Sequence, residues 1–429
     1  MLKPEIKNYG LDLFVPNLMT DIAGFTFIGL VILITFAVSS KWPNISKIIF
    51  TALTIRVLVI LIGHYLVHLP DTKADALGYE WGAWIISQDG FINVLKNFTG
   101  PGSIFYSWVM AIPYSLFGRN ILILQSIGLF FGVGSVFLGW LLAKKLWDEN
   151  IANKVGWILA LFPSLILYSV ITLKEVYCSF FLLLAMFGVV NWTKTKNFSY
   201  AFLAIIGFFV AGFFHGPLFL GGIFFSIIFC VSIFINSFKL LLSLRISLKN
   251  SIVIFLILIF LSALITNKIY LPYLGTFDVA TDIYSILDAI TNRLRGNASY
   301  PEWLIISTPS EFVYKGFFRM LYFLFYPFPW TIKDPIHLIG VLDSFLYFVL
   351  TFLIIFNFKT IWRDPALKII LFILVFYLFI YGIGVSNFGA GIRHRSKFII
   401  EIVLLAGPLI PRFIFSKKKI MKRSWKIFK

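Results

Sequence analysis

Apolar stretches of about twenty residues recur along this chain, and they constrain its fold more than any other feature. As helices they are long enough to cross the ~30 Å hydrocarbon core of a bilayer. The chain is 59% hydrophobic and 13% charged, whereas roughly a quarter of the residues in a soluble domain are charged. We therefore expect an all-α polytopic membrane protein. The predicted spans number about eleven and lie near residues 20–40, 45–69, 120–143, 153–172, 174–191, 199–217, 218–237, 250–268, 337–358, 367–386 and 397–414.

Three further apolar pieces do not resemble spans, and we expect them to be amphipathic juxtamembrane helices. Residues 78–96 place tryptophans on one helical face and polar side chains elsewhere, which is typical of a helix in the membrane interface. Residues 102–117 are too short and contain Pro113. Residues 312–329 contain Arg319 and end in the letters PFPW, which favours a re-entrant or interfacial element. Arg319 is costly to bury in such an element, which makes it a candidate cavity residue that contacts the substrate.

The distribution of charge predicts which end of the bundle faces the cytoplasm. The net charge is +18, but the lysines and arginines lie in short gaps between spans and in the tail, which is typical of cytoplasmic loops that contact anionic lipids. We therefore expect membrane lipids, and no nucleic acid, as partners. The two long loops at about 70–119 and 269–336 would lie outside. The chain then divides into an N-terminal segment at 1–44, a transmembrane domain at 45–414 and a cytoplasmic tail at 415–429.

The first outer loop contains two aspartates that are candidates for acid–base chemistry. In a helix that starts at Asp71, the side chains of Asp71, Asp75 and Tyr79 would share one face. Neighbouring carboxylates repel each other, so one of them could act as a base. Asp71 follows Pro70 and is alternatively a helix N-cap. Asp75 is our candidate base, and a solvated surface charge is the alternative.

A compact basic segment precedes the last predicted span. It contains Arg393, His394, Arg395 and Lys397 after two glycines. Arginine forks and exposed backbone N–H groups suit phosphate, so the segment is a candidate anion site. The alternative is an anchor for lipid head groups, with His394 solvated.

Lys174 and Glu175 lie at a predicted outer hairpin between two spans. They either contribute to the site or form a self-neutralising pair that caps the helices. Cys178 and Cys230 lie in apolar segments and suggest neither a disulfide nor a metal site. No His, Glu, Asp or Cys spacing predicts a metal ion. A divalent cation is possible but is not predicted, and we expect no cofactor.

The order of these features resembles the GT-C glycosyltransferases. The resemblance rests on an acidic outer loop with an Asp-Ala-x-x-Tyr stretch at 75–79, followed by YSLFG at 114–118, LAKKLW at 142–147, FPS at 162–164 and SVITLKE at 169–175. It is closest to the bacterial relatives of the protein O-mannosyltransferases and to the lipid A aminoarabinose transferase. It is clearest over residues 65–195 and recurs at 393–405.

The resemblance implies a GT-C-like bundle that transfers a sugar with inversion from a polyprenyl-phosphate donor. The acceptor would be a glycan, lipid or protein on the outer face of a bacterial inner membrane. The family's catalytic aspartate matches Asp75, with Asp71 as the rival, and its second acidic residue matches Glu175. Tyr79 and Lys174 would lie beside the substrate, and the family's phosphate-binding residues match Arg393 and Arg395. This chain departs from the family in an additional early span and in the lack of a large soluble domain after the last span.

Two other functions remain open at this point. An O-antigen-type polymerase also has many spans and outward-facing arginines, and it acts on the same class of lipid-linked sugar. A transporter or flippase for lipid-linked sugars would have inverted repeats and charges near the membrane midplane. We find few acids at the predicted midplane, which favours chemistry at the outer surface.

Overall fold

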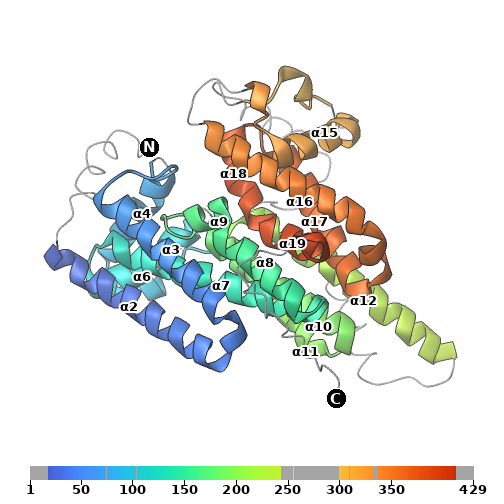
Figure 1. Ribbon diagram of the computed structural model, residues 1–429, viewed down its shortest axis with the longest axis horizontal. Coiled ribbons are helices and arrows are strands. Elements are labelled where there is room, and N and C mark those ends of the chain that lie inside the picture. Colours follow the sequence, from blue (N-terminus) through green and yellow to red (C-terminus); the bar gives the residue numbers. More distant parts are fainter. Residues whose placement is uncertain are drawn as a thin grey trace, which may run out of the picture.

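The structure is a computed structural model that describes residues 18–73, 75–102, 104–242, 255, 299–308, 310–331 and 337–411 (Figure 1). The predicted span at 250–268, apart from residue 255, and the tail at 415–429 lie outside these ranges. The described residues form helices joined by turns, with one isolated bridge between Ser299 and Asn387. An all-helical fold agrees with the sequence pattern.

Seven helical segments in the described ranges are long and apolar enough to cross a membrane. This number supports a multi-pass membrane protein, although it is smaller than the predicted number of spans. Another helix, α11 (Phe198–Phe214), is apolar but shorter. The seven segments are Asp21–Lys41 in α2 (Leu18–Lys41), Pro43–Tyr65 with α3 (Ser46–Tyr65), Ile121–Leu146 (α7), Glu175–Thr195 (α10), Gly216–Ile235 with α12 (Phe219–Leu242), Gly340–Arg363 in α16 (His337–Arg363) and Pro365–Gly384 (α17).

Two predicted spans are not continuous helices, so the prediction of one helix at each position is wrong. The span predicted at 153–172 consists of α8 (Glu149–Leu161) and α9 (Pro163–Tyr168). Proline lacks an N–H group and restricts the preceding residue to extended angles, so the helix ends before Pro163. Up to residue 411, where the described range ends, the span predicted at 397–414 consists of η6 (Ser396–Phe398), α19 (Ile399–Ala406) and η7 (Gly407–Leu409).

The three pieces predicted to stay out of the membrane are short helices. They are α4 (Asp75–Ser87) with α5 (Phe91–Lys96), then α6 (Phe105–Phe117), and α15 (Glu311–Phe325). The longest, α15, has 15 residues, whereas a span needs about 20. Their lengths therefore agree with the expectation of non-spanning elements.

A charged side chain of α4 is buried, whereas the amphipathic pattern of its sequence suggests that its polar side faces water. Glu80 is fully buried. Its carboxylate accepts bonds from Arg119 at 3.0 and 2.9 Å and from the Tyr114 hydroxyl at 2.9 Å. These contacts join α4 to α6 and to the turn after α6, and they hold together the segment between α3 and α7.

The lysines that follow or precede several spans meet at one end of the bundle. The Lys194 ammonium donates to the carbonyl of Lys145 at 2.5 Å. Lys144 pairs with Glu149 at 2.5 Å, and Lys154 donates to the carbonyl of Pro408 at 3.4 Å. These contacts join the ends of α7 and α10 to the start of α8 and to η7. We call this the basic end, and the opposite end carries α4, α6, α15 and α18 (Phe388–Arg395).

Helices α10 and α11 pack closely because small residues face each other. A Cβ atom added to Gly188 would lie 2.5 Å from the amide nitrogen of Ala204, and one added to Gly207 would lie 2.6 Å from that of Ala185. Such small-residue contacts let helix backbones approach in a membrane, where burial of apolar side chains gives little net gain. This packing sets the position of Lys174 and Glu175 at the start of α10.

Candidate functional site

Charged side chains from distant parts of the sequence meet at the end of the bundle opposite the basic end. They come from the start of α4, the start of α10, the helix α18 and the short η6. We call them the charged cluster. Its members are Asp75, Lys174, Glu175, Arg393, His394 and Lys397.

Asp75 and Arg393 form an ion pair although 318 positions separate them. The distance from Nη1 of Arg393 to Oδ2 of Asp75 is 2.5 Å. The Asp75 side chain is 55% exposed and that of Arg393 is 19% exposed. Asp75 is the first residue of α4, where a carboxylate interacts favourably with the helix dipole. Two of the regions that carry the predicted site residues therefore meet.

Asp71 does not share a helix face with Asp75. The prediction of a helix from Asp71 is wrong, because α4 starts at Asp75 and Asp71 has a φ of 59° in the preceding turn. Asp71 is therefore not the N-cap of this helix either. Its carboxylate accepts a hydrogen bond of 2.9 Å from the hydroxyl of Tyr168. Tyr168 is not among the residues predicted from the sequence, where its signal was a polar hydroxyl at the end of an apolar segment.

Glu175 lies inside the protein rather than pointing outward. Its side chain is 1% exposed, and its Oε1 lies 3.3 Å from Nζ of Lys397 and 3.4 Å from Nε of Arg393. Among the residues that the structure describes, its buried Oε2 has no hydrogen-bond partner. The expectation of a self-neutralising pair with Lys174 does not describe these contacts, because Glu175 pairs with the last segment of the bundle. The ammonium of Lys174 instead lies 5.2 Å from the ring centre of Tyr79.

His394 is neutral in this environment. Burial lowers the pKa of its imidazole well below 6.5, and the nearby cations Lys397 and Arg393 add to this effect. Its Nδ1 lies 2.7 Å from Nζ of Lys397, so the imidazole accepts a hydrogen bond from the ammonium group. The ring of His215 lies 5.0 Å from that of His394, and its Nδ1 lies 2.6 Å from the Tyr381 hydroxyl. This second histidine is a neighbour of the site that was not predicted from the sequence.

The acidic neighbours stabilise the charged form of Arg393. Burial alone would lower its pKa, but Glu175 and Asp75 outweigh burial and raise the pKa above the usual value. Arg393 is therefore a permanent cation between an exposed carboxylate and a buried one.

Arg319 lies outside the charged cluster and caps a helix end. It is fully buried. Its guanidinium donates to three backbone carbonyl groups at the C-terminal end of α17 and to one carbonyl group that precedes α15. The acceptors are Gly382, Ile383, Val385 and Leu304, at distances from 2.7 to 3.2 Å, with the Ser386 hydroxyl at 3.0 Å.

Arg395 also points away from the cluster. It is fully buried and pairs with Asp343 at 2.8 Å. It donates to the carbonyls of Leu324 and Tyr326, both at 2.9 Å, at the C-terminal end of α15. Cations stabilise such unpaired carbonyl groups. Because the protein itself uses these donors, we leave Arg319 and Arg395 out of the candidate site.

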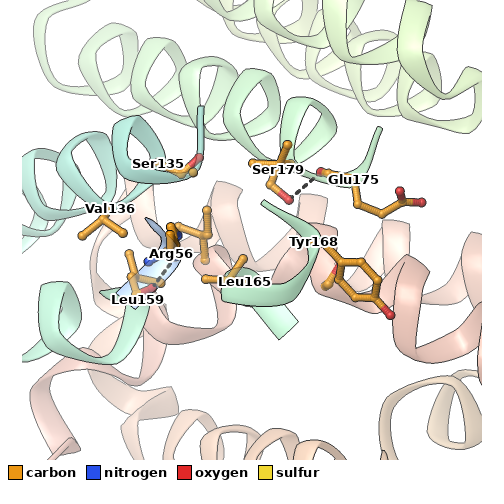
Figure 2. Close-up of a pocket in the computed structure, with 12 residues that line it drawn as sticks. Arg56, Ser135, Val136, Leu159, Leu165, Tyr168, Glu175 and Ser179 are labelled. Carbon is orange, nitrogen blue, oxygen red and sulfur yellow. Dashed lines mark hydrogen bonds between the residues drawn. The ribbon is translucent and has the colours of Figure 1, made fainter. Parts of the chain in front are cut away.

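A third buried arginine adjoins a narrow internal cavity (Figure 2). Arg56 donates to the carbonyls of Leu159 and Ala160 at 3.4 and 3.1 Å, and to the Ser169 hydroxyl at 2.9 Å. These carbonyls end α8, where Pro163 cannot supply the next N–H group. Arg56 thus compensates the helix break between α8 and α9. The cavity also reaches Tyr168 and Glu175, which places it directly beside the charged cluster.

Within the described ranges, no group of three or more His, Cys, Asp or Glu side chains is arranged to hold a metal ion. The cluster is instead rich in cations around carboxylates, an arrangement that suits phosphate and proton transfer. No family model, curated protein or solved structure matches the chain.

Proposed function

We propose that this chain is a membrane glycosyltransferase that moves a sugar from a polyprenyl-phosphate donor to a glycan, lipid or protein acceptor. The observation that carries the proposal is the contact between Asp75 and Arg393 beside the buried pair of Glu175 and Lys397. It places a reachable carboxylate next to fixed cations. A sugar-phosphate donor with a hydroxyl acceptor needs these two groups together.

In the proposed reaction the acceptor oxygen attacks the anomeric carbon of the donor sugar. Asp75 takes the proton of that hydroxyl, since its side chain is more than half exposed. The bond between the anomeric carbon and the phosphate oxygen breaks, and the phosphate leaves with the electron pair. Arg393 stabilises the negative charge that grows on this oxygen, which lowers the barrier more than it stabilises the bound donor.

Glu175 serves as a positioning residue in this scheme. With a side chain that is 1% exposed, it cannot reach an acceptor hydroxyl without a rearrangement. Its negative charge holds Arg393 and Lys397 in place from the interior of the protein. Lys397 in turn donates a hydrogen bond to His394. We place the cluster on the outer face of a cell membrane, because the opposite end carries the clustered lysines expected in the cytoplasm.

The test is sugar transfer by the purified full-length protein in detergent. With a radiolabelled polyprenyl-phosphate sugar, Asp75→Asn should lower turnover by about 100-fold or more, as expected for loss of a general base. The matched control is Asp71→Asn, which removes an equal charge from the same outer segment but does not touch Arg393. Full turnover by a folded Asp75→Asn protein would refute the assignment of the base.

A further inference from the structure

Asp75 and Glu175 occupy different electrostatic positions in the charged cluster. The Asp75 side chain is 55% exposed and that of Glu175 is 1% exposed. Asp75 can therefore exchange its partner for water or for a ligand at little cost, whereas Glu175 cannot leave its cations without strong desolvation costs.

Without Asp75, positive charge dominates the interior of the cluster. Lys174, Arg393 and Lys397 are three cations, His394 is neutral and Glu175 is one carboxylate, which leaves two positive charges. Lys397 is fully buried and Lys174 is 6% exposed. Unbalanced charge is costly inside a protein. Asp75 supplies one balancing negative charge from the solvent side.

Arg393 is held from two directions. Its Nε faces the buried Glu175 at 3.4 Å, without the geometry of a hydrogen bond. Its Nη1 faces outward and pairs with Asp75 at 2.5 Å. An oxygen of an incoming phosphate would need the same outward-facing Nη1 and would bring the negative charge that Asp75 now provides.

We propose that Asp75 is an exchangeable counter-ion that occupies a phosphate site, and that a phosphate on Arg393 displaces it. Displacement frees the carboxylate for the acceptor hydroxyl, so the base becomes available only when a donor is bound. This inference rests on the proposed function for its ligand class, a phosphate ester or diphosphate. The binding step itself requires no sugar transfer.

The experiment measures anion binding to the full-length protein in detergent by calorimetry, at fixed pH and ionic strength. The probes are inorganic pyrophosphate and geranyl phosphate, which separate free phosphate from the lipid-linked form. Asp75→Asn should tighten the binding of at least one probe by about threefold to tenfold, because the ligand no longer competes with an ion pair. Asp71→Asn should change the same affinity by less than about twofold, because Asp71 contacts Tyr168 instead.

Tighter binding of geranyl phosphate alone would assign the site to a lipid-linked phosphate, and tighter binding of both probes would assign it to the phosphate group. Weaker or unchanged binding by Asp75→Asn would overturn the counter-ion role. An equal gain in Asp71→Asn would also overturn it, since the effect would then be one of net charge. No detectable binding of either probe by any of the three proteins would refute the phosphate site. If anion binding tightens as expected but no sugar is transferred, only the proposed function fails.

Discussion

Arg393 and Arg395 both belong to α18 and have different surroundings. Residues two positions apart on a helix do not face each other, whereas residues four positions apart do. Arg393 lies in the cluster with Lys397 of the following η6, whereas Arg395 points to Asp343 and the end of α15. The sequence predicted a basic anion site but no helix at 388–395, so it gave no basis for separating the two arginines.

His394 should make the stability of the protein depend on pH. Its folded-state pKa lies below the usual 6.5 because of burial and nearby cations. Between these two values the unfolded chain binds a proton that the folded protein does not. The free energy of unfolding should therefore be highest above pH 6.5 and fall at lower pH, with a slope of at most ~1.4 kcal/mol per pH unit from this group.

The measurement is thermal unfolding in detergent between pH 7.5 and pH 5.5, a window in which most carboxylates stay charged. In His394→Asn the loss of stability towards pH 5.5 should be smaller than in the unchanged protein. Parallel pH curves for the two proteins would show that other groups cause the loss.

At the scale of elements, close packing of α10 against α11 sets the position of the cluster's buried carboxylate. Gly188→Ala should destabilise the protein by about 1–3 kcal/mol, because the new methyl group would lie 2.5 Å from the backbone of Ala204. The matched control is Gly29→Ala on α2, where an added Cβ meets no atom within 4 Å. This control should stay within about 0.5 kcal/mol of the unchanged protein. Equal melting temperatures for both variants would contradict the packing argument.

The sequence predicts long apolar helices well because length and hydropathy are local properties. The spans around α7, α10 and α17 agree with their predicted positions to within a few residues. The break at Pro163 has a local signal in the proline itself, but the continuous apolar run around it favoured the prediction of one span. The compensating role of Arg56 had no such signal, because the carbonyl groups at the end of α8 to which it donates lie more than 100 positions away.

At the scale of the whole molecule, the two ends of the bundle differ in charge, and this difference predicts orientation. A membrane-impermeant maleimide should label Asp89→Cys in intact spheroplasts of an expressing bacterium, since Asp89 is exposed at the end that carries α4. Lys47→Cys, exposed at the basic end, should be labelled only after lysis. The native Cys178 is buried and Cys230 lies in an apolar helix, so background labelling should be low. The reverse pattern would place the cluster in the cytoplasm.

The meeting of distant segments was only partly predictable from the sequence. Alternating spans and loop charges indicate which loops share a side of the membrane, and so they placed Asp75, Glu175 and Arg393 on one side. They cannot give the distances, which depend on how the helices pack. The inward position of Glu175 and its pairing with Lys397 therefore emerged only from the structure.

The pairing of Glu175 with Lys397 has a consequence for biosynthesis, because 222 positions separate the two residues. Until residues 388–398 have been synthesised, the carboxylate at the start of α10 lacks Arg393 and Lys397. A buried charge without partners is unfavourable, so α10 cannot settle at its final depth during this time. The arrival of residues 388–398 at the translocon should thus be the step that completes the bundle, and chains truncated before this segment should be substrates for membrane quality control.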